Sequence, residues 1–549
     1  MRRETVGAYG IRPSLLQYFV GGSSPLLRFI SRLAYHNENL CRGSGIVRER
    51  WKQFGWKNGD RSMTLQITPS HFYSLYSPSS CELRLYLNCK GVEPAALGAL
   101  EQVIFRLGKR HEKNHLATFP KFSDLTGKPV EKTLEEIRHG SPVIYQGSLN
   151  SHVQIDGRMI EVVGIPDFLI KEGEDYFIRD CKIALRVSEK DHPEISRQLQ
   201  IYGWLFERAT GKRPLRLEVL KGDGDIERLD YEGEAAALSQ LSGLIRIITL
   251  PEEPYSPVGW SKCGGCGYND FCIKRAEEAQ SVALLPDVDQ GLARRLRELG
   301  VSTIKDLATK YDETSLSELK RPWGAREQKV GKKAGGIILQ AKALLENKEI
   351  VVKRPDIPAS KNYVMFDLEG LPPQLDELDK IYLWGMQVFG EKPSGFLYSL
   401  AETGTDGDKK GWEQFLKIAG DILAEYGDIP FAHWANYEKT KINTYIKRYG
   451  DIDGLAERVL ANLVDLLPIT KDAVILPQPS YSLKVVEKHV GFKRTQDEYG
   501  GDWSIAKYIE AVEADDEQKR QEIMNEILKY NEEDLKATWA VFEWVRRYS

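Results

Sequence analysis

The chain has few cysteines, few histidines and no long apolar run. Its 549 residues include 7 Cys and 9 His, and 76 Lys and Arg nearly balance 80 Asp and Glu. The lack of any apolar run of about 18 residues excludes a membrane-spanning helix. A net charge of −4 offers no global basic field, so any contact with nucleic acid must be local. An odd number of cysteines argues against a disulfide framework and indicates the reducing cytoplasm.

The length is too great for a single core, and alternating strand and helix patterns predict an α/β multidomain protein. Residues 1–62 are weakly periodic and carry no motif, so we expect an N-terminal extension outside the catalytic architecture, with Met63 an alternative start. Sharper patterns predict a first domain over 63–278 and a helical, basic region over 279–350. A linker over 351–360 leads to a last α/β domain over 361–549.

Two carboxylates and a lysine gather on a β-hairpin predicted over residues 159–183. Asp167 lies on its first strand, and Asp180 and Lys182 lie on the second. Alternation along a strand places Asp180 and Lys182 on the same face. Carboxylate oxygens bind hard divalent cations, and a neighbouring lysine can orient an attacking water. This combination is typical of metal-assisted phosphodiester hydrolysis.

Further residues extend this pattern in a fixed order. His111 lies on a predicted upstream helix, and Gln198 and Tyr202 share one face of the helix that follows the hairpin. With three cysteines near the end of the domain, the order resembles a RecB-like PD-(D/E)XK nuclease of the iron–sulfur type. That group includes CRISPR-associated exonucleases and the nuclease subunits of recombination helicases. The resemblance implies a restriction-endonuclease-like fold that binds Mg²⁺ or Mn²⁺, with His111, Asp167 and Asp180 as metal ligands, Lys182 as the catalytic lysine, and Gln198 and Tyr202 shaping the site.

The three cysteines of "CGGCGYNDFC", Cys263, Cys266 and Cys272, have C-x2-C-x5-C spacing. Three thiolates leave a four-ligand metal site incomplete, so a fourth cysteine is expected elsewhere. Cys41, Cys81, Cys89 and Cys181 are the candidates. Cys181 is expected to face the core behind the catalytic strand, where a small apolar thiol packs well.

Cys81, on the first predicted helix, occupies the place where the resembling nucleases have their first cluster cysteine, and Cys89 remains the backup. A structural zinc is the alternative cofactor, but zinc modules usually show two short Cys/His pairs. Four cysteines that hold a 4Fe–4S cluster fit the spacing better. The predicted role of this cluster is to join the two ends of the nuclease domain.

The segment "LLPDVDQGLARRLRELGVSTIKDLATK" resembles a helix-hairpin-helix element, which binds a DNA phosphate through the amides of a "GxG" turn. Here the turn reads Asp287-Val288-Asp289, whose carboxylates would repel phosphate. The basic stretch that follows, "KRPWGAREQKVGKKAGG", is the better contact patch, and Trp323 can stack on a base. The alternative is that this basic stretch is an ordinary solvent-exposed charged surface with no ligand.

A second set of acids occupies the last domain. "YVMFDLEG" places Asp367 and Glu369 on one face of a strand, Glu438 begins a helix, and Tyr530 and Asp534 lie four residues apart on another. Four carboxylates can hold two metal ions around a phosphate. The set resembles a DEDDy 3′–5′ exonuclease on an RNase H-like fold, of the YprB-type branch. The resemblance implies metal binding by the four acids and water positioning by Tyr530, although Glu438 replaces the usual aspartate.

The order of the two sets resembles a family of two-headed RecB-like nucleases. The sequence therefore predicts a hydrolase with a 4Fe–4S cluster and Mg²⁺ or Mn²⁺ as cofactors. Its expected partner is nucleic acid, DNA rather than RNA, in a helicase, repair or defence complex. Two alternatives remain open. One is an RNA-directed exonuclease whose first domain is a clamp, and the other is a nucleic-acid-binding adaptor with a silent site.

Overall fold

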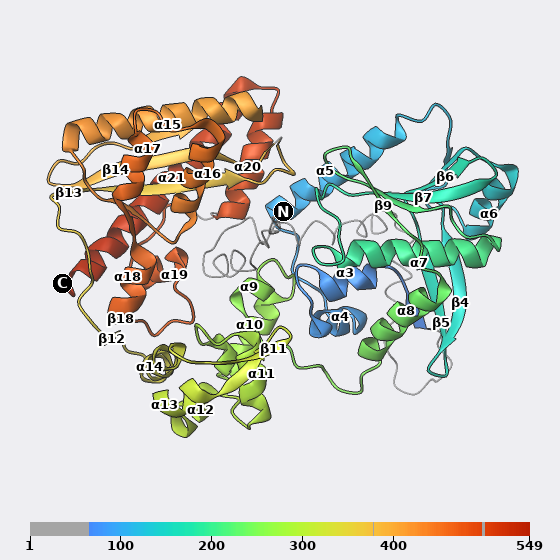
Figure 1. The fold of residues 1–549 in the computed structure, drawn as a ribbon, viewed down its shortest axis with the longest axis horizontal. Helices are drawn as coiled ribbons and strands as arrows, with labels where there is room; N and C mark the ends of the chain where they lie inside the picture. Colours follow the sequence, from blue (N-terminus) through green and yellow to red (C-terminus); the bar gives the residue numbers. More distant parts are fainter. Residues whose placement is uncertain (1–64, 377, 497–499) are drawn as a thin grey trace, which may run out of the picture.

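The computed structural model describes residues 65–376, 378–496 and 500–549. The predicted extension over residues 1–62 lies outside this described part. Figure 1 shows two α/β bodies side by side, the first coloured blue to green and the second yellow to red, with a smaller body beneath them. None of the described helices is both long and apolar enough to cross a membrane.

The first body contains a six-stranded sheet in the order β2-β3-β6-β7-β8-β9 and a three-stranded sheet in the order β1-β5-β4. β6 and β7 form an antiparallel hairpin, and β8 runs parallel to β7 after the crossover helix α7. The strands are β1 (Leu65–Ile67), β2 (Ser123–Asp124), β3 (Val143–Tyr145), β4 (Leu149–Ile155), β5 (Arg158–Gly164), β6 (Phe168–Glu172), β7 (Asp175–Cys181), β8 (Leu217–Leu220) and β9 (Ile226–Leu229).

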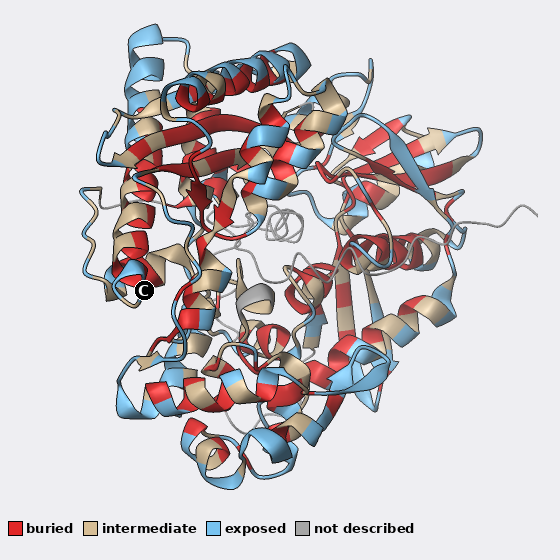
Figure 2. Cartoon of the chain, turned by 60° about the vertical axis from the view of Figure 1, so that its left-hand side comes forward, coloured by how far each residue is buried: buried red, intermediate tan, exposed pale blue. Residues whose placement is uncertain are grey.

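Helices pack on these sheets through apolar faces, and α7 lies between the two sheets. Its residues Leu199, Trp204 and Leu205 are fully buried against Ile160 and Ile178 of the strands. Figure 2 shows α7 red along most of its length. The helices are α3 (Ser70–Tyr76), α4 (Glu82–Cys89), α5 (Ala99–Leu116), α6 (Val130–His139), α7 (Pro193–Thr210) and α8 (Glu234–Ile248).

The prediction of one hairpin over residues 159–183 is wrong for the first half of that range. Residues 158–164 form β5, which pairs with β1 and β4 in the smaller sheet. The hairpin consists of β6 and β7 alone. Pro166 separates the two apolar runs, and proline cannot donate to a strand ladder, so the chain changes sheets at this point.

The middle body combines helices with a short β-hairpin. It contains α9 (Trp260–Cys263), α10 (Asn269–Glu278), η4 (Val282–Leu284), α11 (Gln290–Glu298), α12 (Ile304–Lys310), α13 (Glu313–Glu318), β10 (Lys320–Trp323), β11 (Arg326–Lys329) and α14 (Lys333–Glu346). The sequence predicts only helix here. The hairpin forms because Pro322 cannot continue a helix and Gly324 adopts the positive φ of +60° that its tight turn requires.

The last body is built on a five-stranded sheet in the order β15-β14-β13-β16-β17. β13 pairs antiparallel with β14 and parallel with β16. The strands are β13 (Asn362–Leu371), β14 (Lys380–Gly390), β15 (Leu397–Leu400), β16 (Phe431–His433) and β17 (Leu463–Asp465). The predicted linker begins with β12 (Ile350–Val351), which pairs with β18 (Val474–Ile475).

Two long helices cover opposite faces of this sheet. Val364 and Phe366 of β13 pack with α15, whereas Tyr363 and Met365 pack with α21. Alternation therefore places Asp367 on the face covered by α21. The helices are α15 (Gly404–Tyr426), α16 (Tyr437–Tyr449), α17 (Leu455–Ala461), α18 (Leu466–Ala473), α19 (Leu483–His489), α20 (Gly501–Glu513) and α21 (Glu517–Arg546).

The two α/β bodies share an apolar cluster. Helix α5 of the first packs on α20 of the second, as Figure 1 shows. The cluster includes Ile183, next to Lys182, and Leu371, at the end of β13. Arg106 and Arg110 of α5 flank it through ion pairs with Glu513 of α20. The shared core holds the strands that carry the two acidic constellations in one structural unit.

Candidate active sites and a cysteine cluster

The first acidic constellation forms at the open end of the β6–β7 hairpin. Asp167 precedes β6, Asp180 lies in β7, and Lys182 follows it, and all three are buried. The Asp167 amide is 3.4 Å from Asp180 Oδ1, and the Cys181 amide donates to Asp167 Oδ2 at 2.8 Å. Lys182 Nζ is 2.6 Å from Asp180 Oδ2. The hairpin thus brings the predicted acids and lysine together.

A third carboxylate, Glu112 of α5, joins this group. Gln146 Nε2 donates both to Glu112 Oε1 at 2.6 Å and to Asp167 Oδ1 at 3.1 Å. The predicted ligand His111 instead places Nε2 at 3.3 Å from the Leu220 carbonyl oxygen. Adjacent helical residues point about 100° apart, so the rotation of α5 about its axis decides which of them faces the acids. Sequence reasoning missed Glu112.

Burial and mutual repulsion define the electrostatics of the first site. Burial, followed by the charges of Asp180 and Glu112, raises the pKa of Asp167 well above its usual value. Burial also raises the pKa of Glu112, and Asp180 adds to that effect. Burial opposes the charge on Lys182, but Asp180, Tyr73 and Asp167 together outweigh it, so the pKa of Lys182 is raised and the ammonium persists. Three carboxylates thus face one lysine, an arrangement that a bound cation can balance.

Gln198 and Tyr202 of α7 support the lysine side of the site. Gln198 Nε2 donates to the Tyr202 hydroxyl at 2.7 Å. The Tyr73 hydroxyl of α3 donates to Gln198 Oε1 at 2.7 Å, and Lys182 Nζ lies 5.7 Å from the centre of the Tyr73 ring. This buried chain fixes the wall against which the lysine lies. Tyr73 carries no motif signal in the sequence.

The second constellation forms between β13 and α21. Asp367, Glu369 and Asp534 each offer a carboxylate oxygen within 4.8 Å of the other two. Within the ranges that the structure describes, this is the one group of three His, Cys, Asp or Glu side chains with donors so close. Asn531 Nδ2 donates to Asp367 Oδ2 at 2.7 Å. Gly385, the cross-strand partner of Asp367, leaves the space into which Asn531 fits.

Two of these acids, Asp367 and Glu369, resist ionisation. Burial and then the charge of Asp534 raise the pKa of Asp367 well above its usual value. The same two causes raise the pKa of Glu369 to about 8. Arg494, itself bound to Glu487 at 2.7 Å, forms an ion pair with Asp534. Oxygen ligands at this spacing suit Mg²⁺ or Mn²⁺, whose charge would relieve the repulsion.

Glu438 begins α16, as predicted, but stands apart from the group of three acids. Its Oε2 lies 3.0 Å from His433 Nδ1, and burial raises the pKa of Glu438 despite that partner. Its charge contributes to the raised pKa of Asp367, so it faces the same site. Tyr530, which is buried, contacts Trp503 edge-to-face with ring centres 5.7 Å apart. Burial raises the pKa of Tyr530, so its hydroxyl stays protonated.

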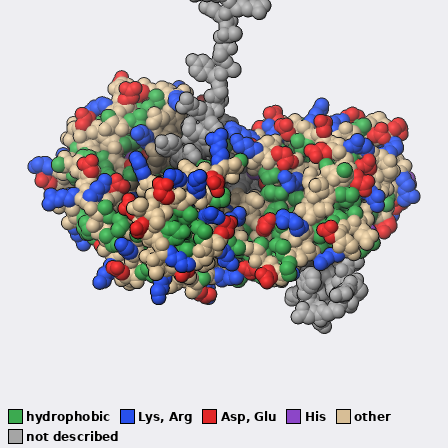
Figure 3. Space-filling view, turned by 60° about the horizontal axis from the view of Figure 1, so that its bottom comes forward, with side chains coloured by type: hydrophobic (Ala, Val, Ile, Leu, Met, Phe, Trp, Pro, Cys, Tyr) green, Lys and Arg blue, Asp and Glu red, His purple; other side chains and the backbone are tan. Residues whose placement is uncertain are grey.

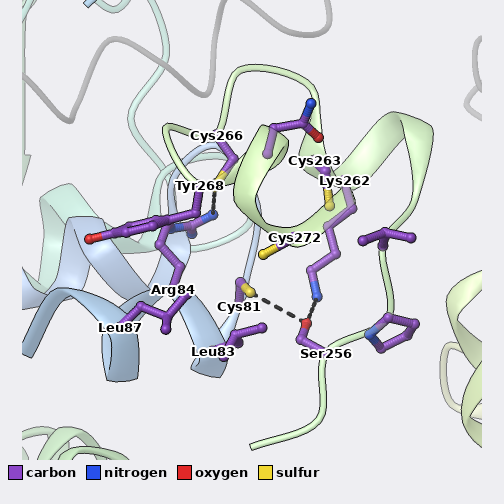
Figure 4. A pocket seen from close by; sticks show the side chains of 13 residues that line it. Cys81, Leu83, Arg84, Leu87, Ser256, Lys262, Cys263, Cys266, Tyr268 and Cys272 are labelled. Carbon is purple, nitrogen blue, oxygen red and sulfur yellow. Dashed lines mark hydrogen bonds between the residues drawn. The ribbon is translucent and has the colours of Figure 1, made fainter. Parts of the chain in front are cut away.

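Four cysteines from distant parts of the chain line one cavity. Cys81 comes from the start of α4, and Cys263, Cys266 and Cys272 come from α9, α10 and the turn between them. Figure 4 shows their sulfurs turned toward a shared space. The prediction that Cys81 lies on the first helix is wrong, because Cys81 is the N-cap residue of α4. A separate first helix, α3, precedes it.

The other candidate cysteines lie elsewhere. Cys89 packs against the main core of the first body, and Cys181, the last residue of β7, is buried in a small apolar cluster, as predicted. Cys41 lies outside the described residues. The structure therefore groups Cys81 with the three-cysteine motif.

Two cations flank the sulfurs. Ser256 Oγ lies 3.3 Å from Cys81 Sγ and accepts a hydrogen bond from Lys262 Nζ at 2.6 Å, and Arg84 Nη1 lies 4.0 Å from Cys266 Sγ. Burial opposes ionisation of Cys81, but Lys262, Ser256 and Arg84 together outweigh it and lower the pKa of its thiol. Thiolate is the form that binds metal.

The sulfurs are spaced more widely than a zinc ion requires. Tetrahedral Zn–S bonds of about 2.3 Å bring sulfurs within about 3.8 Å of each other. In the described part of the chain no three of these sulfurs lie within 4.8 Å of one another. These sulfurs are thus not gathered as closely as the ligands of a single zinc ion.

Comparison with known protein families finds a nuclease superfamily over each of the two acidic constellations. Residues 83–273 match the PD-(D/E)XK nuclease superfamily, and residues 364–546 match the RNase H superfamily. A solved structure described as "Crystal structure of SSO0001" aligns with 43% of this chain and 95% of its own at 12% identity. The TM-score of this alignment is 0.25. No curated protein matches the chain.

The two matched ranges contain the two acidic constellations and three of the four cavity cysteines. The fourth, Cys81, lies just before the first range. The predicted presence of both domains is thereby confirmed. The chain carries a PD-(D/E)XK nuclease superfamily domain and an RNase H superfamily domain, which together support a metal-dependent hydrolase of nucleic-acid phosphodiester bonds.

Proposed function

We propose that the protein is an exonuclease with two metal-dependent sites that hydrolyse single-stranded DNA from its ends. One observation carries the proposal: each domain has its own buried carboxylate cluster. Collecting like charges away from water is costly unless a cation binds between them. The clusters are Glu112, Asp167 and Asp180 in the first domain, and Asp367, Glu369 and Asp534 in the second; all are buried except Asp367, which is half-buried.

In the second domain, Asp367, Glu369 and Asp534 hold Mg²⁺ or Mn²⁺. When bound, the cation stabilises the charge that develops on the phosphoryl oxygens. Glu438 adds the fourth acid, and its pairing with His433 holds it beside the cluster. The protonated Tyr530 hydroxyl positions the attacking water. This assignment follows the DEDDy pattern, with Glu438 in place of aspartate.

In the first domain, Asp167, Asp180 and Glu112 form the metal site. Lys182 remains charged beside Asp180 and orients the water that attacks the phosphate. The chain from Tyr73 through Gln198 to Tyr202 holds the lysine in place. His111, the ligand that the resemblance implies, lies one helical position away, and its contact with Leu220 makes it the weaker candidate.

The four cavity cysteines hold a 4Fe–4S cluster with a structural role. The wide spacing of the sulfurs and the C-x2-C-x5-C motif support a cluster over a single zinc. Lys262 and Arg84 offset the negative charge of a thiolate-bound cluster. The cluster ties α4, near the start of the domain, to α9 and α10 at its end.

The test is hydrolysis of end-labelled substrates by anaerobically purified protein. Single-stranded DNA and RNA, labelled at the 5′ or the 3′ end, are incubated with Mg²⁺, with Mn²⁺ or with EDTA. We expect metal-dependent shortening of DNA and weaker action on RNA. Faster degradation of RNA would replace the DNA proposal with the RNA-directed alternative, and no hydrolysis with either metal would leave a binding adaptor.

A first prediction separates the two neighbouring candidates on α5. In a chain whose second site is inactivated by Asp367→Asn, Glu112→Gln should slow the remaining cleavage about a hundredfold or more, because a metal ligand is lost. His111→Gln should change the rate much less. Initial rates at saturating Mg²⁺ provide the measurement. A large loss with His111→Gln and little with Glu112→Gln would restore the histidine as the ligand.

A second prediction concerns pH and metal binding at Glu369. Its pKa of about 8 in the folded, metal-free protein exceeds the value near 4.5 in the unfolded chain. The folded state therefore holds a proton that the unfolded state releases, and the stability contributed by this group is lost as pH rises toward 8. Metal binding requires the ionised carboxylate, so stabilisation by Mg²⁺ should grow as pH rises.

Thermal unfolding with and without Mg²⁺ at about pH 6 and about pH 8.5 tests this expectation. A cation at about 100 times its Kd stabilises the fold by about 2.7 kcal/mol. The gain should be larger at the higher pH and should shrink in Glu369→Gln. A gain that is equal at both pH values would show that Glu369 does not titrate in this range.

A further inference from the structure

The β10–β11 hairpin, residues 320–329, is the most basic exposed element of the middle body. Residues 320–333 contain six Lys or Arg and one acid, in a chain of net charge −4. Acidic and basic side chains intermix over the face that Figure 3 brings forward. The concentration of cations on this hairpin, called here the Trp323 hairpin, is therefore a local feature.

Several of these cations have no acidic side chain paired with them. Lys320, Arg326 and Lys332 are exposed and form no ion pair with any described residue. Lys320 also lies directly across the hairpin from Lys329, which is paired with Glu318. Like charges at opposed strand positions destabilise a hairpin, so an arrangement of this kind suits an element that binds an anion.

Trp323 stands among these cations with a fixed support beneath it. Its side chain is 39% exposed, although a large aromatic surface is costly to leave in water. The buried Arg321 guanidinium lies 4.5 Å from the centre of the Trp323 ring and is held by Asp289 at 2.8 Å. The ring is thus held on one side by a cation, while part of its surface stays open to solvent.

The hairpin has a rigid attachment to the rest of the molecule. Helix α11 approaches it closely at Gly291, where a side chain would collide with the Pro322 carbonyl oxygen. Asp287, from the turn that resembles a phosphate-binding motif, is paired instead with Lys333 and with Lys471 of the RNase H domain, each at 3.2 Å. The acidic turn is neutralised within the protein, so it does not repel a strand bound at the hairpin.

We propose that the Trp323 hairpin is a binding site for single-stranded nucleic acid, with a base stacked on Trp323 and phosphates beside the unpaired cations. The chemistry fits this ligand because an open aromatic face accepts any base and surrounding cations track the backbone. The inference rests on the proposed function only in taking nucleic acid as the substrate. An acidic protein partner would use the cations but would gain nothing specific from a base-sized aromatic face.

Binding is measured without catalysis, so that this inference and the proposed function are tested separately. Fluorescence anisotropy of a labelled single strand of about 20 nucleotides is recorded in EDTA with the full-length protein. Trp323→Ala should weaken binding by between about 5-fold and about 150-fold, the range for one stacked base, and Trp323→Phe should weaken it less. Phe122→Ala, which removes a similarly exposed ring in the first domain, is the control and should have no effect.

A strand of the same length with abasic sites distinguishes stacking from charge. Trp323→Ala should not change binding of the abasic strand. Lys320→Ala should weaken both strands equally and flatten the salt dependence of log K by about 0.7. Unchanged affinity of Trp323→Ala for the normal strand overturns the inference, whether or not the protein cleaves. Loss of binding in Trp323→Ala supports it even if no hydrolysis is found.

Discussion

Asp367→Asn is expected to abolish cleavage at the RNase H-like site, with a loss of about two to four orders of magnitude in rate. The loss follows from removing one of three carboxylates that hold the cation, which supplies several kcal/mol of transition-state stabilisation. Asp180→Asn should cause a similar loss at the PD-(D/E)XK site. Each single variant should keep the product pattern of the other site, and the double variant should be inactive.

Asparagine is chosen because it removes the charge and keeps the shape. Asp367 accepts a hydrogen bond from Asn531, and one amide oxygen can still accept it. Because the metal-free cluster is repulsive, Asp367→Asn should leave the fold intact or stabilise it in EDTA. A rate loss accompanied by unfolding would therefore contradict the assignment of Asp367 to metal binding.

The controls are exposed aspartates in the same domains. Asp428→Asn, in an ion pair with Arg458, serves the second domain, and Asp175→Asn, paired with Lys212, serves the first. Both should retain full activity, since exposed ion pairs contribute little. If Asp180→Asn alone removes all cleavage, the RNase H-like domain is a binding module and the protein has one active site.

Cys81→Ala is expected to cause the largest loss of stability. A cluster held by Cys81 and the C-x2-C-x5-C motif closes a loop of roughly 180 residues, and a covalent cross-link of that size is worth about 5 kcal/mol in chain entropy. Iron and acid-labile sulfide should fall from about four each per chain to near zero. Cys89→Ala, eight residues along α4 and packed in the core, should lose only about 1 kcal/mol and keep its iron.

Cys81→Ala should also impair the PD-(D/E)XK active site, which lies in the same domain as the cysteine cavity. Arg84 Nε, close to the cysteine cavity, donates to the Ser74 carbonyl oxygen at 2.7 Å, in the helix that carries Tyr73. Releasing this region loosens the contact from Tyr73 to Gln198 that supports Lys182. Cleavage at the first site should therefore fall in Cys81→Ala more than cleavage at the second. Stoichiometric zinc without sulfide in the wild-type protein would refute the cluster.

Local spacing was sufficient to predict the parts of the sites that lie close together in sequence. Asp180 and Lys182 follow from a period of two along a strand, and Tyr530 and Asp534 follow from a period of 3.6 along a helix. The three cysteines from Cys263 to Cys272 are likewise local. Such short-range geometry depends on the backbone of one element, so the sequence alone determines it.

Tertiary packing decided which residues of separate helices and strands come together. The orientation of α5 about its axis selects Glu112 over His111, and the position of α4 selects Cys81 over Cys89 as the companion of the three-cysteine motif. Pairing with distant strands draws residues 158–164 into a separate sheet. The core shared by Ile183 and Leu371 joins two domains that sequence patterns treat separately. These features depend on contacts between residues far apart in the chain, and no local periodicity encodes the rotation or the partner of an element.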